Sequence, residues 1–208
     1  MSSLEVHRLV RYVPRVASEW EVDAPNSLWQ EVDSTLCFVD LSGFTKLSER
    51  LARRGRIGAE ELTEVLNRVF GQMLELAYER GGALLKFGGD ALLLHFVGPA
   101  HAMQAACAAV EMRAALREAA QFKTSVGRVP LRMSVGIHSG IVHMFKVGSS
   151  HRELVVTGPA ATQVASMESA AEAGEILLSP ETARLLPAGA VANPLARPPL
   201  NPALHDRD

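Results

Sequence analysis

Phe38-Val39-Asp40-Leu41-Ser42-Gly43-Phe44-Thr45 joins an expected strand to an expected helix, with an aspartate and a glycine between them. The residues that lead into it, 34–39, are apolar and β-prone, which is typical of a strand buried on both faces. Asp40 stands at the carboxyl end of that strand. The spacing of Phe44, Leu47 and Leu51 predicts a helix directly afterwards, and we expect Ser42 to be its N-cap.

A second stretch repeats the pattern of a carboxylate beside glycine at the end of an apolar run: Leu85-Lys86-Phe87-Gly88-Gly89-Asp90-Ala91-Leu92. Residues 83–87 and 91–97 predict two short strands, and Gly88-Gly89 predicts a tight antiparallel turn between them. This places Asp90 at the tip of a hairpin. Because hard cations prefer oxygen ligands, Asp40 and Asp90 are the predicted ligands of two Mg²⁺ or Mn²⁺ ions.

The residues after Asp40 also predict a place for phosphate. Free backbone N–H groups at the start of a helix favour a polyphosphate, so we expect the substrate's phosphates at Leu41, Ser42, Gly43, Phe44 and Thr45. Either aspartate alone would more commonly be a cap or turn residue. Only the two stretches together favour a metal and phosphate site.

The rest of the chain predicts the fold class. Helices are expected at 59–80, 100–120, 159–171 and 180–186, and strands at 129–137, 141–147, 153–156 and 175–178, with His138-Ser139-Gly140 as a turn. This order predicts an α+β fold, a ferredoxin-like (βααβ-containing) sandwich with helices on one side of a mostly antiparallel sheet. We expect an N-terminal lead-in over 1–30, one domain over 31–187 and a tail rich in proline and alanine over 188–208.

Composition narrows the class of protein. The chain has 208 residues, is 48% hydrophobic and has a formal net charge of -2. Neither nucleic acid nor an anionic membrane is an expected partner, because no basic face is predicted. No apolar run approaches the roughly 20 residues that a membrane helix needs. Cys37 and Cys107 suit buried thiols, so the expected compartment is the reducing cytoplasm.

Four segments in the same order resemble the class III nucleotidyl cyclase catalytic domain, the adenylate and guanylate cyclase family. They are the two stretches above, Val135-Gly136-Ile137-His138-Ser139-Gly140, and Met167-Glu168-Ser169-Ala170-Ala171 leading to Gly174-Glu175-Ile176-Leu177-Leu178-Ser179. The resemblance covers about 34–186. It implies that Asp40 and Asp90 hold two metal ions, and that a nucleoside triphosphate, with ATP favoured, is cyclised with release of pyrophosphate.

The resemblance also shows what this chain lacks. In the family the site lies between two domains, and the second supplies a base-binding Lys and Asp, an Asn and an Arg. Lys86 matches the lysine, but the other positions are degenerate: Val155, Thr162 and Ser166. Loss of such a guanidinium costs a factor of about 10² to 10⁵ in rate. We therefore expect an inactive or very weak enzyme alone, and a partner cyclase-like domain in the same or another chain that completes the site.

This division is similar to the first catalytic domain of the bicarbonate-responsive soluble adenylyl cyclases. The resemblance implies that Lys86 faces a regulatory anion pocket, although the arginine that binds bicarbonate falls at Ala165 here. The main alternative is a catalytically silent pseudo-cyclase that acts as a regulatory or dimerisation module. A diguanylate-cyclase-like enzyme is less favoured, because Ala91-Leu92 replaces the acidic residues expected after Asp90. We expect His138 to be structural rather than a catalytic base.

Overall fold

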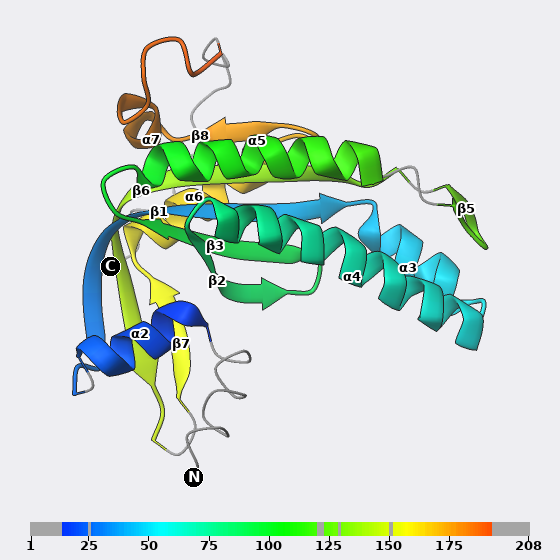
Figure 1. Ribbon diagram of the computed structural model, residues 1–208, viewed down its shortest axis with the longest axis horizontal. Helices are drawn as coiled ribbons and strands as arrows, with labels where there is room; N and C mark the ends of the chain where they lie inside the picture. The colour runs from blue at the N-terminus through cyan, green and yellow to red at the C-terminus, as the bar shows by residue number, and fades with distance from the viewer. Residues whose placement is uncertain (1–13, 25, 120–122, 129, 150–151, 193–208) are drawn as a thin grey trace, which may run out of the picture.

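The structure is a computed structural model that describes residues 14–24, 26–119, 123–128, 130–149 and 152–192 (Figure 1). A six-stranded sheet has the order β2-β3-β1-β6-β7, with β8 paired to β6. Its strands are β1 (Trp29–Ser42), β2 (Gly82–Gly88), β3 (Ala91–Val97), β6 (Arg132–Val147), β7 (Glu153–Thr157) and β8 (Ile176–Leu178). Only the β6–β8 pair is parallel, so the prediction of a mostly antiparallel sheet is confirmed. The strands β4 (Lys123–Thr124) and β5 (Gly127–Arg128) form a small separate hairpin.

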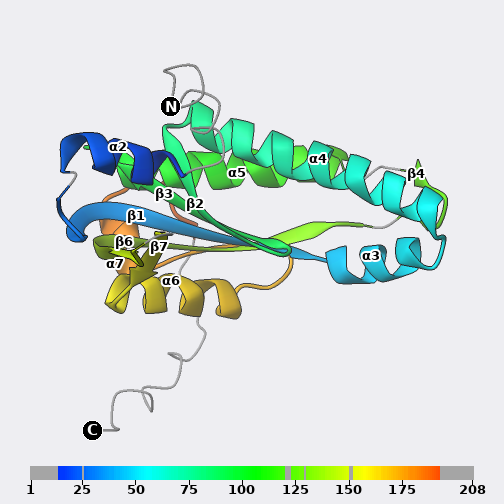
Figure 2. The same cartoon turned by 90° about the horizontal axis from the view of Figure 1, so that it is seen from below.

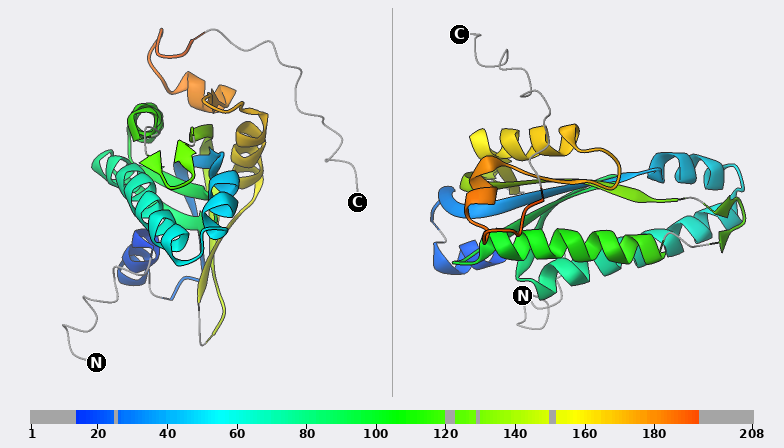
Figure 3. Two further views of the ribbon diagram at one scale, coloured as in Figure 1. Left: turned by 90° about the vertical axis from the view of Figure 1, so that its right-hand side faces the viewer. Right: turned by 90° about the horizontal axis from the view of Figure 1, so that it is seen from above.

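Helices lie on both faces of the sheet. They are α2 (Arg15–Asp23), α3 (Phe44–Ala52), α4 (Arg56–Glu79), α5 (His101–Ala119), α6 (Pro159–Ala170) and α7 (Pro180–Arg184). Figure 2 shows α4 and α5 on one side of the sheet and α6 on the other, and the end-on view in Figure 3 agrees. The expectation that helices cover one side only is wrong. None of the helices in the described ranges is long and apolar enough to cross a membrane.

Strand β1 explains the two helical layers, because its apolar side chains alternate between two cores. Cys37, Val39 and Leu41 belong to the larger core with α4 and α5. Leu36 belongs to a smaller core on the α6 side, and Phe38 packs against it. A strand that is buried on both faces needs a cover on both, and α6 supplies the second.

The predicted turn at His138-Ser139-Gly140 does not exist. Residues 132–147 form one strand of 16 residues, and β1 pairs with all but the last two of them. Continuous ladder hydrogen bonds to β1 keep the backbone extended through a glycine-containing segment that would favour a turn in isolation. His138 is only 9% exposed, and its Nδ1 lies 2.9 Å from Ser179 Oγ, which supports a structural role.

The N-terminal segment contributes to the core. The lead-in predicted over 1–30 contains α2, and Trp20 on this helix is 3% exposed in the smaller core. The Lys146 ammonium lies 4.8 Å from the centroid of the Trp20 ring. The outer part of the lead-in, the start of the strand predicted at 129, and the tail beyond 192 lie outside the described residues.

Candidate active site

Pairing between β1 and β3 brings the two predicted metal ligands together. Asp40 is in register with Ala91, and the Leu41 N–H donates a 3.0 Å hydrogen bond to the Asp90 carbonyl oxygen. Gly88 still pairs with Ala91, so the turn consists of Gly89 and Asp90, one position later than predicted. Gly89 has φ +70°, which favours glycine. The placement of Asp90 at the hairpin tip is therefore correct.

Asp40 lies in an acidic environment. Burial raises the pKa of its carboxyl above the ordinary value, and the nearby charges of Asp90 and Glu168 raise this pKa further. Each cause disfavours the ionised form of Asp40. A cation bound between these carboxylates would offset the repulsion, so the electrostatics of this end of the sheet favour a metal ion.

Glu168 lies near Asp40, and the sequence assigns it no role. It lies on α6, and its Oε1 accepts a 2.8 Å hydrogen bond from the Ser134 hydroxyl. Ser134 is in register with Asp40 on the neighbouring strand. The segment around Glu168 was recognised only as a family motif, because the register between β1 and β6 that brings it to Asp40 has no local sequence signal.

Gly43 begins the helix that follows Asp40. It is the N-cap of α3 and has φ +91°. There is little room for a side chain here, since an added Cβ would lie 3.1 Å from the Pro130 carbonyl oxygen. Ser42 is the last residue of β1, in register with Arg132. The prediction that Ser42 caps the helix is therefore wrong, because the chain must turn with a positive φ at the cap, which glycine adopts without strain.

The first turn of α3 lies next to Asp90. Backbone N–H groups at the start of a helix have no partner within the helix, so those of Phe44 and Thr45 face outward from its N-terminus. The Thr45 hydroxyl donates a 3.2 Å hydrogen bond to Asp90 Oδ2. The Leu41 side chain is buried in the core, and its N–H is bonded to the Asp90 carbonyl oxygen. Leu41 therefore has no free N–H to donate to a phosphate.

The residues predicted for the second half-site lie on three other elements. Lys86 is exposed on β2, in register with Leu93, whereas Val155 is 39% exposed on β7 at the other edge of the sheet. Thr162 and Ser166 lie one turn apart on α6. Thr162 is exposed, and its hydroxyl donates a long 3.4 Å hydrogen bond to the Gly158 carbonyl. Of these four side chains, Lys86 alone is cationic.

Comparison with known proteins identifies the family. The adenylate and guanylate cyclase catalytic domain model matches residues 29–194. The chain belongs to this family. Human adenylate cyclase type 10 is 30% identical over 153 residues, which are 71% of this chain and 9% of that protein. The chain thus spans about a tenth of the length of the curated relatives of this type.

Solved structures agree with this assignment. The guanylyl cyclase Cya2 has a TM-score of 0.66 at 32% identity, with 76% of this chain and 80% of that chain covered. The guanylate cyclase domain of RhGC from Catenaria anguillulae, solved in complex with GTP, has a TM-score of 0.63 at 25% identity, with 75% and 83% covered. The ferredoxin-like α+β prediction is therefore confirmed as a cyclase domain fold.

The residues of this cyclase domain fit a hard divalent cation. Asp40 and Asp90 offer carboxylate oxygens, which Mg²⁺ and Mn²⁺ prefer. Within the described residues, no three His, Cys, Asp or Glu side chains gather closely enough to hold a metal ion by themselves. Mg²⁺ is usually held by one or two carboxylates together with substrate phosphates, so a pair of aspartates beside the N-terminus of α3 is a suitable donor set.

Proposed function

We propose that this cyclase domain is the metal-binding half of a nucleotidyl cyclase active site that forms cyclic AMP and pyrophosphate from ATP. One observation carries the proposal: Asp40 and Asp90 meet at one end of the sheet, beside the helix start at Gly43. Two carboxylates and free helical N–H groups are the chemistry that a metal triphosphate requires.

The chain's own residues would orient the substrate. Two Mg²⁺ or Mn²⁺ ions bound by Asp40 and Asp90 would lower the pKa of the ribose 3′-hydroxyl and neutralise the triphosphate. The N–H groups of Ser42, Gly43, Phe44 and Thr45 would hold the phosphates. The 3′-oxygen then forms a bond to the α-phosphorus, the bond to pyrophosphate breaks, and the hydroxyl proton passes to solvent.

A second cyclase-like domain, in this or another chain, would supply the rest of the site. The family uses an acid, an amide and a guanidinium at three positions. In this chain those positions hold Val155, Thr162 and Ser166, which carry none of these groups. Without that guanidinium, the charge that develops on the transferring phosphoryl group has no partner, at a cost of about 10² to 10⁵ in rate. Lys86 remains for base binding or for an anion in a second pocket.

The preference for ATP rests on the adenylate cyclases among the relatives, and a relative solved with GTP is the reason to test both nucleotides. The cytoplasm remains the expected compartment, in keeping with the free thiols of Cys37 and Cys107. Neither nucleic acid nor a membrane is a proposed partner.

Binding and turnover test the proposal separately. We expect the purified chain to bind ATP only when Mn²⁺ is present, to lose this binding on Asp40→Ala substitution, and to make almost no cyclic AMP or cyclic GMP alone. Rapid cyclic nucleotide formation by the isolated chain would contradict the need for a partner. Absence of metal-dependent binding would instead favour the alternative, a silent pseudo-cyclase that regulates or dimerises with another domain.

A further inference from the structure

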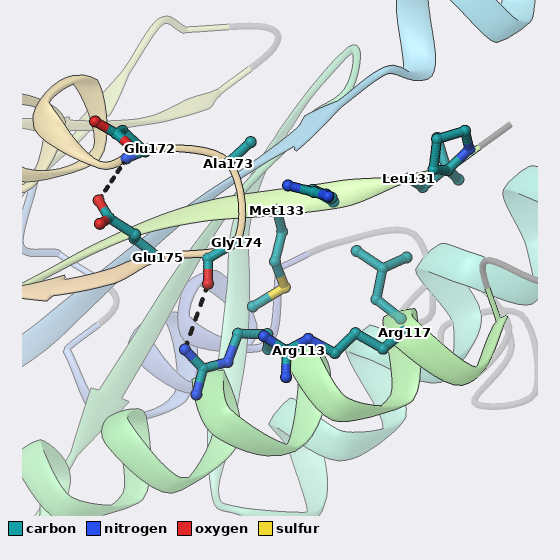
Figure 4. A pocket seen from close by; sticks show the side chains of 11 residues that line it. Arg113, Arg117, Leu131, Met133, Glu172, Ala173, Gly174 and Glu175 are labelled. Atoms are coloured by element: carbon teal, nitrogen blue, oxygen red, sulfur yellow. Dashed lines mark hydrogen bonds between the residues drawn. The ribbon is translucent and has the colours of Figure 1, made fainter.

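A cavity of about 550 Å³ lies between α5, the start of β6 and the loop that joins α6 to β8 (Figure 4). Its floor is apolar, since Leu116, Leu131 and Met133 line it and belong to the larger core. Neither Asp40 nor Asp90 lines this cavity. We call it the arginine cavity, because Arg113, Arg117 and Arg132 are among its walls.

Two arginines on α5 line this cavity from the helix side. Arg113 and Arg117 are one turn apart, so their side chains leave the helix on the same face, where like charges repel. Arg113 donates a long 3.4 Å hydrogen bond to the Gly174 carbonyl, which Figure 4 marks. Arg117 is exposed and forms no hydrogen bond or ion pair within the described residues, so its N–H donors are open to a ligand.

Arg132 adds a third guanidinium from the strand. It is exposed at the start of β6 and, like Arg117, has no hydrogen bond or ion pair to any residue in the described ranges. Helix α5 and strand β6 therefore present cationic groups to one cavity from two directions. Guanidinium groups bind phosphate and carboxylate through paired N–H donors, so this is a suitable arrangement for an oxyanion.

Glu172 and Glu175 limit which anion would fit. Both line the cavity on the loop side, and Glu175 Oε2 accepts a 2.8 Å hydrogen bond from the Glu172 N–H, which holds the loop in a tight turn. Two carboxylates would repel a polyphosphate. A ligand with a single small anionic head, placed against Arg117 and Arg132, avoids them better.

The geometry points to a second ligand site in the arginine cavity, for a small molecule with one phosphate or carboxylate head and an apolar body. The head pairs with Arg117 and Arg132, and the body covers the apolar floor. The site is separate from the metal centre but shares a wall with it. Pro130 and Leu131 line the cavity, and a Cβ added at Gly43 would lie 3.1 Å from the Pro130 carbonyl oxygen and 3.9 Å from Leu131 Cδ2.

Calorimetric titration of the metal-free chain with phenyl phosphate, benzoate and phenol tests the site. The two anions distinguish a phosphate head from a carboxylate head, and phenol is the neutral control. We expect saturable one-to-one binding of at least one anion and none of phenol. Arg117→Met and Arg132→Met each keep an unbranched side chain with an apolar stem but remove its charge, and each should weaken binding at least about tenfold.

Matched variants separate this site from general charge and from the metal centre. Arg53→Met removes an exposed arginine next to α3, outside the cavity, and should change the affinity by less than about twofold. Asp40→Asn should also leave binding intact, so the result does not depend on the proposed cyclase function. The proposal is overturned if neither anion binds saturably up to about 10 mM, or if Arg53→Met weakens binding as much as Arg117→Met. Unfolding midpoints confirm that each variant is folded.

Discussion

The Ser134 hydroxyl donates a 2.8 Å hydrogen bond to Glu168 Oε1, and this bond joins α6 to the strand that pairs with Asp40. Two consequences follow. A third carboxylate is held near the predicted metal ligands, and it raises the pKa of Asp40 together with burial and Asp90. The helix that carries the degenerate positions Thr162 and Ser166 is thereby linked to the metal end of the sheet.

Substitution of Glu168 should change the protonation of Asp40. In Glu168→Gln the neighbouring negative charge is removed, so the pKa of Asp40 should fall toward its ordinary value without reaching it, since burial and Asp90 still raise it. Carbon-detected NMR titration of the Asp40 carboxyl in the metal-free chain measures this shift. Glu49→Gln, an exposed change on α3, is the control. An unchanged Asp40 titration in Glu168→Gln would show that Glu168 does not act on the site.

Removal of the Asp40 charge should stabilise the metal-free chain at neutral pH. Because the folded-state pKa of Asp40 is raised, the unfolded chain binds fewer protons than the folded chain at pH values between the ordinary pKa and the raised pKa. The stability of the folded chain therefore falls as the pH rises through this interval. Asp40→Asn avoids this loss, so its urea midpoint should exceed that of the unchanged chain near pH 7. The difference should disappear in acid, where Asp40 is protonated.

Asp33→Asn, at an exposed position of the same strand, serves as the comparison and should leave the midpoint nearly unchanged. A lower midpoint for Asp40→Asn at pH 7 would mean that the carboxylate has a structural role that outweighs its repulsion. Asp40→Asn should also abolish Mn²⁺-dependent ATP binding, since an amide is a much poorer ligand than a carboxylate for a hard cation.

Close packing at Gly136 should make it intolerant of a side chain. A Cβ there would lie 2.3 Å from the Glu168 backbone nitrogen and 2.5 Å from the Val164 carbonyl oxygen, so α6 would have to move. Gly136→Ala should lower the free energy of unfolding by about 1 to 3 kcal/mol. Gly71→Ala on α4 has nothing within 4 Å and should raise it by up to about 1 kcal/mol. Urea denaturation measures both, and equal midpoints for the two variants would contradict this packing argument.

We predict that an altered second copy of the chain can supply the residues that the proposed site lacks. In this copy Val155→Asp, Thr162→Asn and Ser166→Arg restore the family's residue types, and Asp40→Ala removes its own metal ligand. Mixed with the natural chain, it should raise cyclic AMP formation at least about tenfold over either chain alone, because a guanidinium now faces the transferring phosphoryl group. Sedimentation shows whether the chains associate. Association without any increase in rate would count against the proposed division of residues.

Local pattern in the sequence was sufficient for most helices and for the hairpin that carries Asp90. The helix periodicity of 59–80 became α4, Arg56–Glu79, and the apolar strands beside Gly88-Gly89 became β2 and β3. These elements form from contacts within a few residues, so their signal is local. The errors at Ser42 and Gly88 are each one residue long, which is the usual uncertainty of a boundary.

Local sequence pattern places Asp40 and Asp90 beside tight turns, and the sequence motifs resemble a cyclase domain with degenerate positions at Val155, Thr162 and Ser166. The tertiary structure adds that β6 runs straight through His138, that Trp20 lies in a core, that Glu168 lies near Asp40, and that three arginines line one cavity. The physical reason is that these features arise from pairing and packing between β1, β6, α5 and α6, which are far apart along the chain, and local periodicity carries no information about such contacts.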